Sequence, residues 1–196
     1  MPVIEVIKAH VLARLEHELS PHLLYHGIHH TRDDVLPAAE RFAQLSKVRG
    51  EDLLLLQTAA LYHDIGFIEN RYDHEAIGAR MAAEELVDFG FNDTQIERIC
   101  SMIMATHLPQ SPRDDLEALL CDADMDSLGR DDFFATSHHL RLELMRQGEM
   151  VSLKEWSLGQ LRFLQGHTYF SKAAHRLRDE QKQHNINELL ELFYLR

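Results

Sequence analysis

The chain has 196 residues and a formal net charge of −12, so its surface as a whole repels nucleic-acid backbones and anionic membranes. A chain of this length can bury a substantial core, and we expect one domain over residues 1–196. Its two cysteines, Cys100 and Cys121, lack a CxxC spacing, and no stretch approaches about 18 uncharged apolar residues in a row. We therefore expect a cytoplasmic protein whose partners are neither nucleic-acid polymers nor membranes, and the sequence is compatible with a homo-oligomer.

Apolar residues at helical spacing run through the whole chain, and no run alternates strictly as a half-buried strand does. Residues 3–18 are expected to form an amphipathic helix that Ser20-Pro21 ends. A short stretch dense in histidine, residues 25–31, precedes a second helix that ends near Leu45. The chain is therefore predicted to be all-α.

The next helix, residues 53–62, is the most apolar segment and leads directly into His63-Asp64. Its apolar residues fall on every side of a helical wheel, so we expect it to be buried all round, with Gly66 ending it in a left-handed conformation. A buried imidazole beside a buried carboxylate needs a compensating charge, which a divalent cation supplies. The alternative is that His63 caps helix carbonyls while Asp64 is partly solvated. The doublet alone does not decide between the two.

Two further helices are expected before Pro109. Asp73 is a suitable N-cap for the first, which runs to about Phe89. Asn92 is a suitable N-cap for the second, whose apolar residues lead toward His107. A polar side chain again follows an apolar helix at this point.

Three aspartates at alternate positions, Asp122, Asp124 and Asp126, end the following apolar segment. Because successive helical residues are about 100° apart, Asp122 and Asp126 are expected on one side and Asp124 nearly opposite them.

The last part of the chain, from about residue 148 to 196, is expected to add helices to the domain but little chemistry. Helical spacing predicts segments over residues 131–146, about 154–165 and 169–193. Four aromatic residues at helical spacing are interpreted as packing residues: Trp156, Phe163, Tyr169 and Phe170.

Six polar residues stand at or beside the ends of the predicted helices, in a chain with 14 histidines: His30, His63, Asp64, His74, His107 and Asp124. Imidazole nitrogens and carboxylate oxygens together suit Mn, Mg, Fe, Co, Ni or Zn, whereas a structural zinc site favours thiolates. We therefore expect one or two divalent ions at an open, catalytic site. Since one carboxylate can bridge two cations, Asp64, in the centre of the set, is the candidate bridge.

This pattern resembles the HD-domain superfamily of metal-dependent phosphohydrolases, whose motif is a histidine, a His-Asp doublet and a distal aspartate. His30, His63-Asp64 and Asp124 match it in order and spacing, and the resemblance extends over roughly residues 20–130. It implies an HD-type helical bundle with additional C-terminal helices and a divalent metal held by these four residues. It also implies hydrolysis of a small phosphate ester, a nucleotide above all, by water activated at the metal.

The resemblance also implies roles for other residues. His74 and His107 look like the two further histidines of members that bind two metals, and Asp122 is expected to orient a neighbouring ligand. His26 stands where related cyclic-nucleotide phosphodiesterases place a proton donor to the leaving oxygen, so His26 and Asp64 are the expected catalytic residues. A surface position is the alternative for His26.

Some nucleotide-cleaving relatives carry a catalytic acid just after the doublet, where this chain has Ile65-Gly66-Phe67. Glu69 and Glu75 are interpreted as solvated acids at helix ends rather than as substitutes for it. Among the arginines that could contact a phosphate, Arg130 is preferred because it follows the distal motif directly. The expected partner is therefore a small-molecule phosphate.

Two other functions are compatible with the same ligand set. Some members of the superfamily use six nitrogen and oxygen ligands to hold two irons for oxygen chemistry, so a di-iron oxygenase is the first alternative. The second is a non-catalytic module that keeps a metal for stability or senses a nucleotide.

Overall fold

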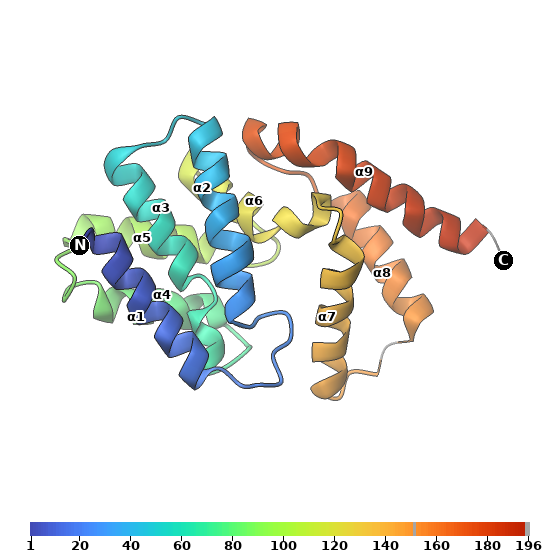
Figure 1. Ribbon diagram of the computed structural model, residues 1–196, viewed down its shortest axis with the longest axis horizontal. Coiled ribbons are helices and arrows are strands. Elements are labelled where there is room, and N and C mark those ends of the chain that lie inside the picture. The colour runs from blue at the N-terminus through green and yellow to red at the C-terminus, as the bar shows by residue number, and fades with distance from the viewer. Residues whose placement is uncertain (151, 195–196) are drawn as a thin grey trace.

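The computed structural model describes residues 1–150 and 152–194, and within these ranges it contains helices and turns but no strand. The predicted all-α fold is confirmed. The long helices are α1 (Val3–Glu18), α2 (Leu36–Leu45), α3 (Gly50–Tyr62), α4 (His74–Glu85), α5 (Asp93–Ala105), α6 (Asp115–Asp124), α7 (Phe133–Arg146), α8 (Leu153–Gly166) and α9 (Lys172–Tyr194). A π-helical turn η1 (His30–Val35) and two 3₁₀ turns, η2 (Ile65–Ile68) and η3 (Asp126–Gly129), connect them. Helices α1 to α6 gather at one end of the molecule and α7 to α9 at the other (Figure 1).

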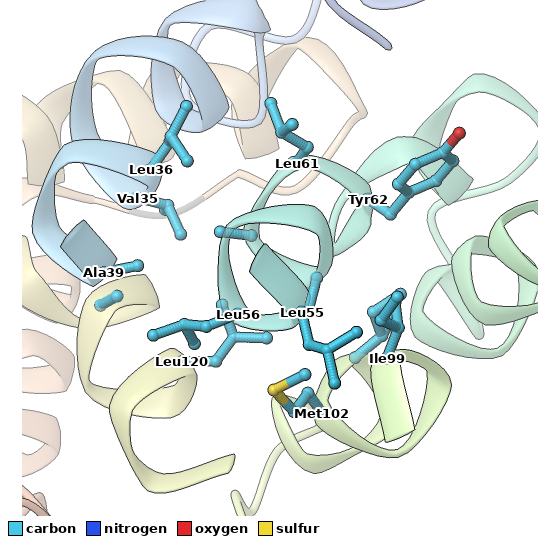
Figure 2. Packing of buried hydrophobic residues seen from close by; sticks show 14 of the residues in the cluster. Val35, Leu36, Ala39, Leu55, Leu56, Leu61, Tyr62, Ile99, Met102 and Leu120 are labelled. Atoms are coloured by element: carbon cyan, nitrogen blue, oxygen red, sulfur yellow. The ribbon is translucent and has the colours of Figure 1, made fainter. Parts of the chain in front are cut away.

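Helix α3 runs through the larger hydrophobic core, and its last turns are buried on all sides. Figure 2 shows α3 surrounded by side chains from η1, α2, α5 and α6, among them Val35, Ala39, Ile99, Met102 and Leu120. Burial of each large apolar side chain stabilises the fold by about 1.5–3 kcal/mol. The predicted all-round burial of this helix is confirmed, and it carries the doublet after it into the interior.

Two glycines let α4 approach the end of α3 closely. A Cβ atom on Gly66 would lie 2.0 Å from the carbonyl oxygen of His74, and one on Gly78 would lie 2.9 Å from the carbonyl oxygen of Tyr62. Gly66 is not among the residues with positive φ, so the predicted left-handed conformation is wrong. Its missing side chain is needed for space, because the backbone of α4 occupies the position of its Cβ.

The helix ends agree only in part with the predicted caps. The Asn92 side chain accepts a hydrogen bond from the Gln95 N–H, and the Gln95 side chain accepts one from the Asn92 N–H, which is a complete capping box. Asp73 stands before α4 with φ of 55° but makes no side-chain cap, and α4 ends at Glu85 rather than near Phe89. The N-cap of α5 is therefore confirmed, whereas the Asp73 side-chain cap and the Phe89 boundary are wrong.

The C-terminal helices have a small core of their own, formed by Leu128, Phe133, Leu161, Leu164, Ile186 and Leu189. Asp122 fastens them to the larger core, because its carboxylate accepts the backbone N–H groups of Phe170 at 2.8 Å and Ser171 at 2.7 Å. Asp126 binds the guanidinium of Arg178 on α9. The two aspartates thus share one side of the chain, as their spacing predicted, but Asp122 holds backbone rather than orienting a ligand.

None of the helices within residues 1–150 and 152–194 combines the length and apolar character that crossing a membrane requires.

Candidate metal centre

Three predicted ligands converge from three different elements. His30 begins η1, His63 follows α3, and Asp124 is the last residue of α6. Asp124 Oδ1 lies 3.1 Å from His30 Nε2 and 3.7 Å from His63 Nε2. All three offer ligand atoms within 4.8 Å of one another, so this group could hold a metal ion.

The two carboxylate oxygens of Asp64 face different histidines. Asp64 Oδ2 lies 3.3 Å from His63 Nε2 and 3.6 Å from His30 Nε2. Asp64 Oδ1 lies 3.5 Å from His74 Nε2. A carboxylate can bridge two cations with one oxygen on each, and this division of the Asp64 oxygens is compatible with that role, which stays a prediction.

The ring nitrogens that face Asp64 are fixed by hydrogen bonds on the other side of each ring. His63 Nδ1 lies 2.8 Å from the Ala60 carbonyl oxygen, and His74 Nδ1 lies 3.1 Å from the Arg71 carbonyl oxygen. Because a carbonyl only accepts, each Nδ1 carries a proton, and the neutral form of each ring presents a bare Nε2. Backbone carbonyls commonly orient metal-binding imidazoles in this way.

The centre contains buried polar atoms without a hydrogen-bond partner. They are His63 Nε2 and Asp64 Oδ2, the same atoms that face each other. Burial alone would keep both groups neutral, but the facing charges raise the pKa of His63 and lower the pKa of Asp64. Leaving buried polar atoms unpaired is costly, and a divalent cation would satisfy both. The residues present therefore fit a bound metal.

His26 is held beside the centre by a glutamate from the C-terminal helices. His26 Nδ1 lies 2.6 Å from Glu143 Oε1, and Glu143 Oε2 accepts the backbone N–H groups of Tyr25 and His26. The His26 ring also stacks on Phe67, with ring centroids 4.3 Å apart. Burial disfavours the charged imidazole, but Glu143 and the nearby Asp64 carboxylate outweigh it and raise the pKa of His26.

A cavity of about 280 Å³ lies against the centre. Residues of the centre and their neighbours line part of it: Tyr25, His26, Asp64, His74, Glu75, Thr106 and Asp124. Its remaining wall is formed by Leu108, Met125, Ser127, Leu128, Phe133, Thr136, Ser137, Leu140, Gln160 and Phe163. Helices α7 and α8 therefore line the same cavity as the predicted metal centre, and the interpretation of Phe163 as a packing residue is incomplete.

The two glutamates near the centre differ in position. Glu69 is exposed and pairs with Arg80, as expected of a solvated acid. Glu75 is buried and lines the cavity, with its Oε2 3.4 Å from His74 Nδ1. The interpretation of Glu75 as solvated is therefore wrong: the first turn of α4 directs this acid inward together with His74.

Two predicted site residues lie away from the cluster. His107 is exposed, and although Thr106 and Leu108 on either side of it line the cavity, His107 does not. The Arg130 guanidinium is occupied by Asp34 and Asp132, which together contact all three of its nitrogens, and Arg130 is not a lining residue either. A ligand role for His107 and a phosphate contact for Arg130 stay predictions that this geometry does not support.

Comparison with known families agrees with the fold and the cluster. The family model described as HD domain matches residues 32–128. The chain therefore belongs to the HD-domain superfamily. The match contains the His63-Asp64 doublet and Asp124, whereas His26, His30 and Glu143 lie outside it. No curated protein and no solved structure matches the chain.

Sequence reasoning missed Glu143 and the cavity wall. Glu143 is buried on α7, near the stripe of Phe133, Ser137 and Leu140. The sequence does place Glu143 close to the apolar, inward-facing stripe of a predicted helix, which is a sign of a buried acid. It does not show that the partner of this acid is His26.

Proposed function

We propose that the protein is a metal-dependent phosphohydrolase that acts on a small phosphate ester, with nucleotides as the favoured class. The observation that carries the proposal is the pair of buried, unpartnered atoms, His63 Nε2 and Asp64 Oδ2, beside a cavity that His26 also lines. Such atoms are stable inside a protein when a cation binds them.

The proposed ligands of one ion are His30, His63, Asp64 and Asp124. His74 is the proposed ligand of a second ion, since it faces the other oxygen of Asp64. When bound, a divalent cation lowers the pKa of a coordinated water and offsets the negative charge of a phosphoryl group. The chain's own contribution is to fix the Nε2 atoms of His63 and His74 toward the ligand site.

His26 is the proposed proton donor to the leaving oxygen. Because its pKa is raised, His26 keeps the protonated ring, which is the form that a general acid requires, to a higher pH than an ordinary histidine does. Glu143 holds the ring at the cavity wall through Nδ1, so Nε2 is the atom left to carry the transferable proton. The stack on Phe67 fixes the plane of the ring.

The test begins with elemental analysis of protein purified without chelator. It continues with an anaerobic screen of phosphate esters in the presence of Mg, Mn, Co or Ni. We expect one or two metal ions per chain and release of phosphate without oxygen. His63→Ala should lose both, whereas His139→Ala, which changes an exposed histidine on α7, should keep both.

Two results would overturn the proposal. Iron-dependent oxygen uptake with no anaerobic turnover would make the protein an oxygenase. Bound metal without turnover of any ester in the panel would make it a regulatory or structural module.

We also propose a cytoplasmic setting, which the unbonded state of Cys100 and Cys121 supports.

A further inference from the structure

The geometry points to a specific substrate class: one phosphoryl group on an uncharged body with a flat ring, such as a nucleoside monophosphate. Helices α7 and α8, which lie beyond the matched HD region, provide much of the wall that would bind this body. The inference rests on the proposed function, because the phosphoryl group is assigned to the predicted metal centre.

The charge of the cavity lining favours a substrate with a single phosphoryl group. The described residues that line the cavity include three acids, Asp64, Glu75 and Asp124, but no lysine or arginine. A metal centre can neutralise one phosphoryl group, and the proposed acid His26 faces its leaving oxygen, but the further phosphates of a di- or triphosphate would meet no lysine or arginine in the lining. Transfer of such charges out of water without a partner is strongly unfavourable.

Arg130, which the sequence suggested as a phosphate contact, and three other arginines do not supply this missing positive charge. Each already contacts a carboxylate: Arg71 pairs with Glu149, Arg80 with Glu69 and Glu84, Arg113 with Glu117, and Arg130 with Asp34 and Asp132. None of the four lines the cavity. Recruiting one for a distal phosphate would require breaking its ion pair and moving its side chain.

Part of the cavity wall is apolar and aromatic. Phe133 and Leu140 from α7 and Phe163 from α8 give it an apolar surface. Phe163 has 38% of its surface exposed, so an aromatic face remains available to a ligand. A flat, uncharged ring system would bury this apolar surface favourably, whereas a small polyol would leave it exposed to solvent.

The same wall contains a few polar groups. Ser137 Oγ accepts a hydrogen bond from Trp156 Nε1 at 2.9 Å and keeps its own hydroxyl hydrogen for an acceptor. The Gln160 amide, with one donor group and one acceptor, also lines the cavity. Few polar groups in an apolar pocket orient a ligand rather than supply most of its affinity.

A binding test needs no metal and no turnover. Trp156 is the single tryptophan of the chain and bonds to a residue of the cavity wall, so its fluorescence should report occupancy. In chelator-treated protein we titrate the four common ribonucleosides and their 5′-mono- and triphosphates. At least one nucleoside should give a saturable change, and its triphosphate should bind at least tenfold more weakly. A triphosphate that binds as tightly as its nucleoside, or no response to any nucleoside, would overturn the inference.

A turnover test uses a cation placed in the cavity. With metal present, the wild type should show a kcat/KM at least tenfold higher for the preferred monophosphate than for its triphosphate. Thr136→Lys should reduce this ratio at least tenfold, because Thr136 lines the cavity. Thr136→Met, which is long and neutral, and Ala135→Lys, which adds the charge at an exposed neighbouring position, should not change the ratio.

The results separate the inference from the proposed function. If no ester is hydrolysed but the nucleoside binds more tightly than its triphosphate, the inference about the pocket is supported and the proposed function fails. If esters are hydrolysed and triphosphates are preferred, the proposed function is supported and the inference fails.

Discussion

His26 Nδ1 and Glu143 Oε1 lie 2.6 Å apart although 117 positions separate the two residues in the chain. The contact joins the segment before the matched HD region to a helix after it. It predicts that Glu143→Gln, which keeps the size of the side chain but removes its charge, lowers the pKa of His26. The protonated, acid form of His26 is then lost at a lower pH.

We therefore expect Glu143→Gln to move the basic limb of the kcat profile to lower pH and to reduce kcat at neutral pH roughly tenfold. Metal content should stay unchanged, which separates this effect from damage to the metal centre. A wild-type pH profile in the variant would show that Glu143 only holds the backbone of Tyr25 and His26.

Removal of either residue of the doublet should abolish metal binding and hydrolysis. His63→Ala loses the nitrogen that faces Asp64, and Asp64→Ala, which loses contacts to three histidines, should have the more complete effect. Elemental analysis and turnover of the folded variants, verified by circular dichroism, measure both losses. Wild-type metal content and activity in these variants would refute the proposed centre.

Metal stoichiometry tests the second ion. If His74 binds it, His74→Ala should lower the metal content from about two ions per chain to about one, with Asp64 and the other ligands intact. The same measurement on His107→Ala decides the prediction for that residue. An unchanged content in His107→Ala would identify His107 as a surface histidine, in agreement with its exposed position.

Gly66→Ala should destabilise the protein by about 2–3 kcal/mol, at the upper end of typical overpacking costs. The reason is that the new Cβ meets the backbone of His74, which cannot turn away as a flexible side chain could. Gly159→Ala is the matched control, since Gly159 lies inside α8 with open space at its Cβ position and should gain about 0.5–1 kcal/mol. Chemical denaturation measures both changes. Equal stability of the two variants would contradict the prediction and would mean that the backbone of α4 can shift away from the new Cβ atom at little cost.

His167 should make the fold less stable in acid. Burial, together with the charge of Lys182, lowers the pKa of His167 to about 4 from an ordinary value of 6.5, and both ring nitrogens lack hydrogen-bond partners. Between these two values the unfolded chain binds the proton and the folded one does not. The free energy of unfolding is therefore unaffected by His167 above pH 6.5. It decreases as the pH falls from 6.5 through 4, where the folded protein also binds the proton.

The matched variant is His167→Phe, which keeps a ring but cannot titrate. From pH 7 to pH 4 the wild type should lose on the order of 2 kcal/mol more unfolding free energy than the variant, after allowance for the partial exposure of the ring. Denaturant titrations at both pH values measure this difference. Parallel losses in the two proteins would show that His167 does not titrate in this range.

The sequence contained enough to predict the fold class and to select His30, His63, Asp64 and Asp124, which the structure brings together. Each stands at the end of a helical segment or beside it, and the order and spacing of the four residues match the motif of the superfamily. Their roles as ligands stay predictions until a metal is measured.

Other features depend on how helices dock, which no local pattern specifies. Glu143 and Phe163 reach the cavity only because α7 and α8 pack across it from the far end of the chain. The sequence suggested that position 66 requires glycine for a left-handed conformation. The structure shows instead that the close approach of α4 leaves no space for a side chain there. The sequence suggested that Glu75 is solvated. Its side chain points inward because of the way α4 docks against the end of α3, and this docking is not visible in the sequence.

The carboxylate of Asp122, which holds the backbone at Phe170 and Ser171, has a practical consequence for expression of shorter forms of the protein. A fragment cut to residues 32–128 would leave this buried acid without its two N–H donors and would expose apolar surface beneath α9. It would also lack His26, His30 and Glu143. We therefore expect the independently folding unit to extend beyond the limits of the family match, so any shortened form should retain both the segment before α2 and the three C-terminal helices.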